Sequence, residues 1–467
     1  MHSRSALSQP SSNIAEALSV FAHDLQLSAI PEAVWTKSVH HIVDAVGLAF
    51  ASHRFPFAGP GLKGIRAAAG AGVATVIGGD ARLAARDAAF ANGYLVHGLD
   101  FDDTHPAAIV HPTAACLPTA LALAETNDAT WGQMIAAYVA GMETAIRLGR
   151  AVKGGFHHVG FHATGIVSHF SSAVVAGKLL DLSVDQLVSA QGIAASTASG
   201  VQVFLENGAW TKRMHPGWGA LAGITAAHLA EAGFAGPRRP YEGRFGLLDT
   251  HLQELAGEVD ADSVAQELGS TWTMLDTSIK PYPVCHFIHG CAEAALQLRG
   301  KIDSAVRIAR IVCELPAATL PIVAEPASAK IVPQSDYEAK FSAQFVVAAC
   351  FVRNRFTLGE LSDESLGDPQ ILALAAKTEC LAETDSNFPR YFSGAVSITL
   401  DDGRELRAQV PVNLGSGARA LSLDDIVSKF RGNAGTGLSE GHADAVLDAL
   451  LSATPDTPVR AITRLLG

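Results

Sequence analysis

The chain has 467 residues, of which 48% are hydrophobic and 17% are charged, and its formal net charge is −12. This composition excludes a disordered protein, because it supplies ample apolar side chains for a large core. The acidic balance argues against nucleic acid as a partner, since phosphate binding needs a basic face. No window approaches the roughly 18 consecutive apolar residues of a membrane span, so we expect no membrane partner.

Cysteine usage and the first residues of the chain indicate the compartment. The six cysteines are scattered, without the paired spacing of a metal site or a disulfide framework, which is typical of reduced thiols in a cytoplasmic protein. Residues 1–5 begin no apolar run, so we expect no secretory signal. The apolar surface of an Ala- and Gly-rich helical chain is commonly buried between subunits, and we therefore expect a homodimer.

The first part of the chain predicts one helix after another, separated by glycine-rich breaks. Apolar residues at helical spacing predict helices over residues 14–25, 31–51, 83–97, 131–152, 164–180, 183–197 and 218–232. Ser11 or Ser12 is the expected N-cap of the first helix, Asp80 caps the third and Thr164 begins the fifth.

The pattern changes near residue 277. Val306 and Ile308 flank Arg307 in a strand-like alternation, and residues 396–400 and 406–410 alternate in the same way. The sequence Asp-Asp-Gly at 401–403 between the last two segments predicts a hairpin turn. Helices are predicted between these strands over residues 287–298, 337–351 and 369–377. The helical pattern then returns over residues 423–430, capped at Ser422, and over residues 443–451.

These patterns predict a mainly α fold. We expect a large all-helical domain whose first part covers residues 1–276, an inserted α+β lid domain over residues 277–412, and C-terminal helices over residues 413–467 that return to the helical domain. A cleft between two such domains is a favoured place for a ligand.

One segment, residues 92–113, carries an unusual density of polar groups in a chain that is poor in charge. Asp100 and Thr104 are expected to orient other groups, while His111 faces the substrate, because a helix end followed by a loop is a common place for catalytic groups. Asp and His side chains also ligate metals, so a metal site is an alternative. A capped helix end with solvated aspartates is the structural alternative.

Two further segments could bind an anion. His162 stands at an expected helix N-terminus, where free N–H groups and the helix dipole attract anions. Lys212 belongs to a run of cationic residues, 212–215, which we expect to precede a helix and to form an anion clamp. A structural histidine and a basic surface turn are the respective alternatives.

Residues 278–290 fall where the helical part meets the α+β part. Two prolines stiffen the loop and restrict Lys280 relative to Cys285 and His286. A Cys–His nucleophile pair is possible chemistry, but without an acyl-transfer signature Cys285 is better interpreted as a pocket wall or a proton donor. The segment 333–345 predicts a capped amphipathic helix with Glu338 and Lys340 facing outward.

Collected, these groups favour acid–base chemistry on a carboxylate-rich small molecule. Removing a proton beside a carboxylate, or expelling a β-hydroxyl, needs a base, an acid and cations that offset the developing charge. Histidine can serve as acid or base near neutral pH. The chain contains no nucleotide-binding fingerprint or nucleophile elbow, and we expect no cofactor.

The segments HGLDFDDTHPAAIVHP, GFHATG, TKRMHPGWGA, KPYPVCHFIHG and DYEAKFSAQF occur in this order, and the chain thereby resembles the MmgE/PrpD family over nearly its whole length. The family includes 2-methylcitrate dehydratases, cis-aconitate decarboxylases and iminodisuccinate epimerases. The resemblance implies action on a small polycarboxylate without a metal or organic cofactor. It also implies a helical domain split in sequence, an α+β lid domain and usually a dimer.

The motifs carry the family's active-site positions onto this chain. The predicted catalytic residues are Asp100, His111, His162, Lys212, Lys280 and Cys285, and the predicted substrate-binding residues are Thr104, Lys212, Lys280 and His286, with no metal ligand. In this scheme the lysines bind carboxylates, the two histidines share proton transfer, and Asp100 holds a histidine or a lysine in position.

One departure from the family pattern decides between reactions. The family's decarboxylases have a pattern in which a catalytic histidine follows five residues after the lysine of the KPYP segment, Lys280 here. In this chain Cys285 occupies that position, with His286 beside it. We therefore expect dehydration or hydration, with decarboxylation and epimerisation as alternatives on the same fold. A non-catalytic carboxylate-binding protein and a metal-dependent hydrolase are the alternatives from other classes.

Overall fold

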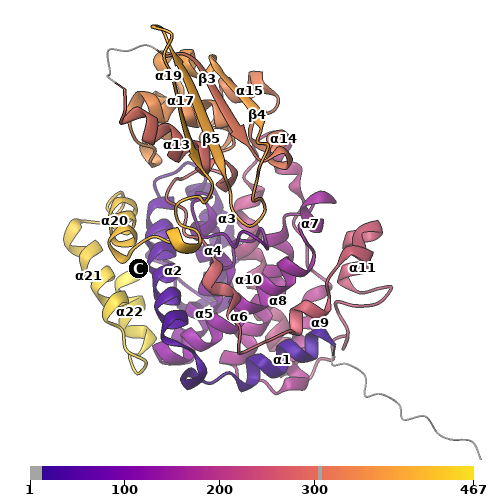
Figure 1. The fold of residues 1–467 in the computed structure, drawn as a ribbon. Coiled ribbons are helices and arrows are strands. Elements are labelled where there is room, and N and C mark those ends of the chain that lie inside the picture. The colour runs from indigo at the N-terminus through magenta and orange to yellow at the C-terminus, as the bar shows by residue number, and fades with distance from the viewer. Residues whose placement is uncertain (1–12, 303–307) are drawn as a thin grey trace, which may run out of the picture.

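The computed structural model describes residues 13–302 and 308–467 of the chain. Within these residues the fold is mainly α, with 22 α-helices, one two-stranded sheet and one four-stranded sheet. None of the described helices is both long and apolar enough to span a membrane. Figure 1 shows the four-stranded sheet and its helices at the top of the view and the large helical body below.

Twelve helices precede the junction with the larger sheet, and together with the C-terminal helices they form the helical body. They are α1 (Ile14–Asp24), α2 (Glu32–Ser52), α3 (Ala58–Ala68), α4 (Ala85–His97), α5 (Thr113–Thr126), α6 (Trp131–Ala151), α7 (Gly155–His158), α8 (Ala163–Leu179), α9 (Val184–Ala195), α10 (Thr211–Glu231), α11 (Leu247–Leu252) and α12 (Asp262–Ala265). The small sheet pairs β1 (Ala71–Thr75) with β2 (Arg82–Leu83). Capping boxes at Thr130 and Ser183 begin α6 and α9, since each side chain accepts the N–H of the third helical residue.

Close helix packing places the elements that carry the polar segments. Helix α10 packs against both α4 and α8. At the crossing with α4, a Cβ on Gly93 would lie 2.6 Å from the Cα of Gly217, so the two backbones touch through glycine. Close approach of this kind needs small residues, and it fixes the end of α4 next to the beginning of α10.

The second unit, which we call the sheet unit, contains the four-stranded sheet in the order β4 (Thr378–Ala382), β3 (Ile308–Leu315), β5 (Gly394–Leu400) and β6 (Glu405–Val410). Strand β3 is parallel to β4 and antiparallel to β5, and β5 is antiparallel to β6. The predicted hairpin at 401–403 is confirmed, with Gly403 at a φ of 85°. The helices of this unit are α13 (His289–Arg299), α14 (Leu320–Val323), α15 (Ala327–Ile331), α16 (Asp336–Ala339), α17 (Ala343–Arg353), α18 (Asp363–Leu366) and α19 (Pro369–Ala375).

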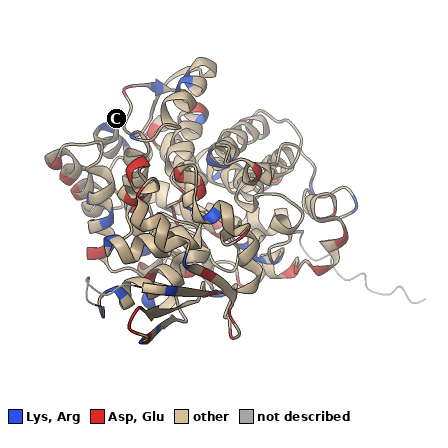
Figure 2. Ribbon diagram, turned by 90° about the horizontal axis from the view of Figure 1, so that it is seen from above, with Lys and Arg blue, Asp and Glu red and all other residues tan. Residues whose placement is uncertain are grey.

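The C-terminal helices pack back onto the helical body. They are α20 (Leu423–Ala434), α21 (Glu440–Ser452) and α22 (Val459–Leu466), and in Figure 1 they lie beside α2 in yellow. One hydrophobic core contains buried residues between 14 and 279 together with residues between 426 and 466, whereas a second core contains Phe204 and buried residues between 284 and 410. Charged residues of both signs are scattered over the molecule (Figure 2).

Most predicted helices are confirmed to within a few residues, but three boundaries are wrong. Helix α4 begins at Ala85 rather than at residue 83, and Asp80 pairs with Arg66 instead of capping it. Helix α10 begins at Thr211 rather than at residue 218, with Pro216 inside it. The helix predicted over 337–351 is broken into α16 and α17, because Ser342 begins a new helix by accepting the N–H of Phe345.

Helices α3, α5 and α22, strand β4, the small sheet of β1 and β2, and the short helices α7, α11, α12, α14, α15 and α18 were not predicted from the sequence. The expected caps Ser11 and Ser12, and the expected strand residues Val306 and Arg307, lie outside the described residues. Asn13 is the observed N-cap of α1 and accepts a 3.0 Å hydrogen bond from the backbone N–H of Glu16.

The contact between α4 and α10 gives a first prediction. In the variant Gly217→Ala the new Cβ would lie 2.4 Å from the carbonyl oxygen of Phe90, so the helices must separate. We expect roughly 1–3 kcal/mol less stability, measured by denaturant unfolding. The control is Gly64→Ala on α3, where nothing lies within 4 Å of a new Cβ. Replacing a helical glycine at such a position should increase the free energy of unfolding, by at most about 1 kcal/mol. Equal stabilities of the two variants would contradict this packing account.

Candidate functional site

A cavity of about 600 Å³ lies between the helical body and the sheet unit. All eight residues predicted from the sequence line it. They are Asp100, Thr104, His111, His162, Lys212, Lys280, Cys285 and His286. They come from the loop after α4, the N-termini of α8 and α10, and the junction between the two units. The structure therefore brings together segments that are separated by up to 186 residues in sequence, from Asp100 to His286.

Asp100 is the centre of the polar part of the cavity. Its Oδ2 accepts a hydrogen bond of 2.8 Å from Lys212 Nζ, and its Oδ1 accepts one of 3.0 Å from Lys280 Nζ. All three side chains are buried. Burial alone would raise the pKa of Asp100, but the two ammonium groups outweigh burial and hold this pKa well below its usual range. The carboxylate is therefore ionised, and it holds both lysines at the cavity wall.

The backbone around Asp100 is held by lysines from three parts of the chain. Lys340, Lys280 and Lys429 each donate a hydrogen bond to one carbonyl of residues 99–101, in that order, at 2.8, 2.7 and 2.9 Å. Asp100 itself has a φ of 52°, a left-handed conformation that a residue other than glycine adopts rarely and at a cost. We call these side chains the lysine clamp. It holds a strained backbone in the one conformation that presents Asp100 to both cavity lysines.

The junction between the two units is tied to the same loop. Thr104 and Ser278 exchange two backbone hydrogen bonds of 2.9 Å, in an isolated antiparallel bridge. This bridge lies two residues before Lys280. The position of Lys280 is thus set by the backbone of the polar segment that it contacts.

The hydrogen bonds of His111 define which of its nitrogens carries the proton. The Nδ1 atom lies 2.7 Å from the backbone carbonyl oxygen of Asp103, which can only accept, so Nδ1 carries the proton. In the neutral ring Nε2 is then the basic nitrogen, and it lies 3.8 Å from Asp100 Oδ1. The backbone N–H of His111 donates to Thr164 Oγ1 at 3.1 Å. The ring is therefore oriented with its basic nitrogen beside the Asp100 centre.

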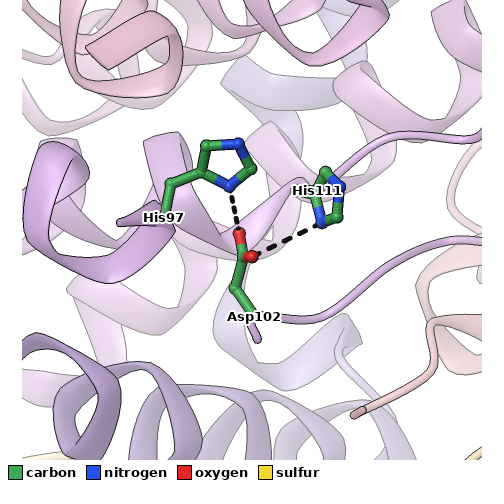
Figure 3. A group of neighbouring side chains, drawn as sticks. All are labelled: His97, Asp102 and His111. Carbon is green, nitrogen blue, oxygen red and sulfur yellow. Dashed lines mark hydrogen bonds and ion pairs between the residues drawn. The ribbon is translucent and has the colours of Figure 1, made fainter. Parts of the chain in front are cut away.

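His97 and Asp102 lie behind His111. Asp102 Oδ2 accepts a 2.7 Å hydrogen bond from His97 Nδ1, and its Oδ1 lies 3.6 Å from His111 Nδ1, so the carboxylate stands between the two rings (Figure 3). Among the described residues, these three side chains have the spacing of a possible metal site. Nδ1 of each histidine already has a hydrogen-bond partner, Asp102 for His97 and the carbonyl of Asp103 for His111. These contacts explain the arrangement without a metal ion, since His97 holds the Asp102 carboxylate beside the His111 ring.

His162 is in contact with a second histidine, His215. It is the N-cap residue of α8, and its Nδ1 lies 3.1 Å from Nδ1 of His215, so one of the two rings donates to the other. The prediction that Thr164 begins this helix is wrong by one residue, because the helix begins at Ala163. The Thr164 hydroxyl instead accepts a hydrogen bond from the backbone N–H of His111. The His162 ring stacks on His97 with a centroid distance of 5.5 Å.

His111 and His162 have a lowered pKa and are neutral at physiological pH. Burial lowers the pKa of His111 to about 3, with Lys280 adding to this effect and Asp102 opposing it. Burial and then Lys212 lower the pKa of His162 well below its usual range. Ionised lysines beside neutral imidazoles give the site both anion-binding cations and a free base.

Cys285 and His286 line the cavity where the sheet unit begins. Burial, followed by the charge of Asp100, raises the pKa of the Cys285 thiol, so this cysteine stays protonated. A thiol in this state fits a wall or a proton donor better than a nucleophile. His286 Nε2 lies 3.0 Å from Asn413 Nδ2, while its Nδ1 atom has no protein partner among the described residues.

The sequence analysis missed several members of the site. His97, Asp102 and Lys429 were not singled out, although the density of aspartates around residue 102 was the available signal. The prediction that Lys340 faces outward is wrong. This side chain is fully buried, because α16 ends at Ala339 and turns Lys340 toward the carbonyl of Leu99.

Comparisons with known proteins match the chain over most of its length. Residues 16–257 match the MmgE/PrpD N-terminal domain and residues 282–453 match the MmgE/PrpD C-terminal domain. The chain is 28% identical to a cis-aconitate decarboxylase of Homo sapiens, with 93% of this chain and 90% of that protein covered. It is 25% identical to a cis-aconitate decarboxylase-like protein of Aspergillus oryzae, with 98% of both covered. It is 27% identical to a 2-methylcitrate dehydratase of Cupriavidus necator, with 78% of both covered.

The lysine clamp can be tested by hydrogen exchange. In Lys340→Met the carbonyl of Leu99 loses its buried donor, so we expect faster amide exchange across residues 99–105 in a chain that remains folded. The control is Lys330→Met, since Lys330 also donates to two carbonyls, those of Ile322 and Phe341, but does not touch this loop. Unchanged exchange over residues 99–105 in Lys340→Met would contradict the clamp.

The neutral histidines predict a loss of stability in acid. Ten described histidines have a lowered pKa. They are His40, His41, His105, His111, His157, His162, His169, His215, His286 and His289. Below a pH of about 6.5 these histidines bind protons in the unfolded chain but not in the folded chain, so the free energy of unfolding falls as the pH falls. Asp44 and Asp103, with pKa values raised by burial to about 6 and about 8, act in the opposite direction but are only two groups.

We therefore expect Tm to fall between pH 7 and pH 5. His169→Gln removes one buried histidine outside the cavity. It should make the free energy of unfolding less dependent on pH, by up to about 1.4 kcal/mol per pH unit. The control is His23→Gln, which replaces an exposed histidine on α1 and removes no buried group. A Tm that is constant or rises over this range would mean that the buried histidines are protonated in the folded protein.

Proposed function

Because the chain belongs to the MmgE/PrpD family, we propose that it is a lyase that dehydrates or hydrates a small polycarboxylate of the 2-methylcitrate or aconitate type without a cofactor. The observation that carries the proposal is the Asp100 centre. Two buried lysines and one ionised carboxylate stand beside the unprotonated Nε2 of His111 in one cavity. Such a site can bind carboxylates and move a proton at the neighbouring carbon.

In the proposed reaction His111 is the base. Its Nε2 accepts the proton from the carbon beside a carboxylate, and the electron pair of that C–H bond forms the new double bond. Lys212 and Lys280 bind the carboxylates and offset the negative charge that develops on the adjacent one. The charge of Asp102, which His97 holds 3.6 Å from His111 Nδ1, stabilises the positive charge that His111 acquires.

The leaving hydroxyl needs a proton so that it departs as water. A bound polycarboxylate brings negative charge close to His162 and raises its pKa, so that this ring can take up a proton and deliver it. Cys285, whose thiol is protonated, is the second donor in reach of the same cavity. Hydration is the same sequence of steps in reverse.

Decarboxylation is the second candidate, and the comparisons favour it specifically. The relatives that bear the name cis-aconitate decarboxylase cover 93–100% of this chain, whereas the 2-methylcitrate dehydratases cover 77–78%. His286, one residue after Cys285, supplies an imidazole in that part of the cavity. Epimerisation of a dicarboxylate needs the same base, and a non-catalytic carboxylate-binding protein needs only the lysines.

The remaining architectural expectations are part of this proposal. We propose that the sheet unit, residues 277–412, acts as a lid over a helical domain made of residues 1–276 and 413–467. We also propose a cytoplasmic homodimer. Support for a dimer comes from apolar side chains that are exposed and close together in sequence, Val201, Val203, Leu205, Trp210 and Trp218.

The direct test is an NMR assay of chelator-treated protein in deuterated water, with citrate, 2-methylcitrate, cis-aconitate and related dicarboxylates. We expect a carbon-bound deuterium and a dehydrated or hydrated product from at least one compound, with no effect of the chelator. Carbon dioxide release or inverted stereochemistry would select the alternative reactions. Activity lost with the chelator and restored by a metal would select the hydrolase class, and binding without conversion would select the non-catalytic protein.

A substitution tests the anion clamp within this site. Lys212→Ala removes a charge-assisted contact worth roughly 1.5–3 kcal/mol, so we expect KM to rise and kcat to fall, with kcat/KM lower by at least about tenfold. The control is Lys63→Ala at an exposed position on α3, which should behave as the parent protein. Full activity of a folded Lys212→Ala variant would exclude this lysine from carboxylate binding.

A further inference from the structure

The cavity has a second, apolar part that acid–base chemistry on a polycarboxylate does not use. Five apolar side chains line it from the sheet unit, Phe287, Ile322, Phe341, Phe388 and Phe392. Three of them form one aromatic wall. The ring centroids of Phe287 and Phe388 lie 5.7 Å apart, and those of Phe287 and Phe392 lie 5.4 Å apart.

This wall is continuous with the polar centre. The centroid of Phe341 lies 5.2 Å from Lys212 Nζ, and that of Phe392 lies 4.4 Å from the His286 ring. A ligand held by the lysines can therefore extend directly along phenylalanine side chains.

The cavity is also larger than a simple tricarboxylate requires. Thirteen bonded heavy atoms, the number in citrate, occupy less than thirteen waters, or about 390 Å³ at about 30 Å³ per water. The cavity measures about 600 Å³. Part of the remaining volume is bounded by the apolar side chains of the sheet unit, and a further carboxylate placed against them would lose its hydration without compensation.

We propose that the natural substrate carries an apolar arm, an alkyl chain of several carbons on the carbon skeleton of the acid, that lies against Phe287, Phe388 and Phe392 while the carboxylate head lies on Lys212 and Lys280. The inference rests on the proposed function for the chemistry of the head group. It adds that the aromatic wall selects long-chain acids over the methyl-substituted acid.

Binding of a homologous series tests the arm without requiring turnover. The probes are 2-methyl-, 2-butyl- and 2-hexylsuccinate, which share one head and lack a hydroxyl to expel, and Kd is measured by titration calorimetry. We expect Kd to fall by about fourfold for each methylene that enters the apolar part. A Kd that is constant or rises with chain length would overturn the proposal.

A variant assigns the effect to the aromatic wall. Phe388 is half-buried, so Phe388→Ala should fold, and we expect it to weaken 2-hexylsuccinate by at least about fivefold more than 2-methylsuccinate. The matched control is Phe234→Ala, a phenylalanine that is 59% exposed and does not line the cavity. Equal losses for both probes in Phe388→Ala would overturn the assignment.

The two proposals fail separately. A rising affinity along the series, together with no exchange or conversion in deuterated water for any substituted acid, would leave the apolar arm standing and refute the lyase. Conversion of 2-methylcitrate with no gain from a longer chain would confirm the lyase and refute the arm.

Discussion

A carboxylate buried between two lysines is the interaction on which the rest of the site depends. Moving an ion out of water costs several kcal/mol, and Asp100 is stable in its ionised form only because Lys212 and Lys280 both reach it. These partners come from α10 and from the junction between the helical body and the sheet unit. The clamp adds Lys340 from the sheet unit and Lys429 from α20. The geometry of the site therefore forms only when every part of the fold has docked, which makes assembly of the site a consequence of folding.

In the same arrangement the positive charge and the proton acceptor are different side chains. Positive charge is fixed on lysines that are paired with Asp100, whereas burial lowers the pKa of His111 and His162 and leaves both rings unprotonated and able to accept a proton. The carbonyl of Asp103 sets the tautomer of His111, so that its free nitrogen lies beside the charged centre. A small acid that binds to the lysines is thus presented to a base whose protonation state was established before binding. This preorganisation is the main electrostatic contribution a protein can make to such a reaction.

The sequence predicted the residues of the cavity better than their supports. Asp100, His111, Lys212 and Lys280 stand in dense polar motifs whose spacing is visible along the chain, and all of them line the cavity. The burial of Lys340 was not predicted because helical spacing favoured one continuous helix over residues 337–351. In the structure α16 ends at Ala339, immediately before Lys340. Helix α5 was missed because 13 of its 14 residues, 113–125, are buried, which leaves no amphipathic period to detect. The beginning of α10 was misplaced because tertiary packing against α4 and α8 outweighs the helix-breaking tendency of Pro216.

The most direct test of the central claim is a crystal structure of the protein with tricarballylate, a tricarboxylate that lacks a hydroxyl to lose. The account predicts one carboxylate within hydrogen-bond distance of both Lys212 Nζ and Lys280 Nζ, and a methylene carbon facing His111 Nε2. The bonds between Asp100 and the two lysines would remain. A ligand bound away from these lysines, or a metal ion between His97, Asp102 and His111 in contact with the ligand, would contradict the account.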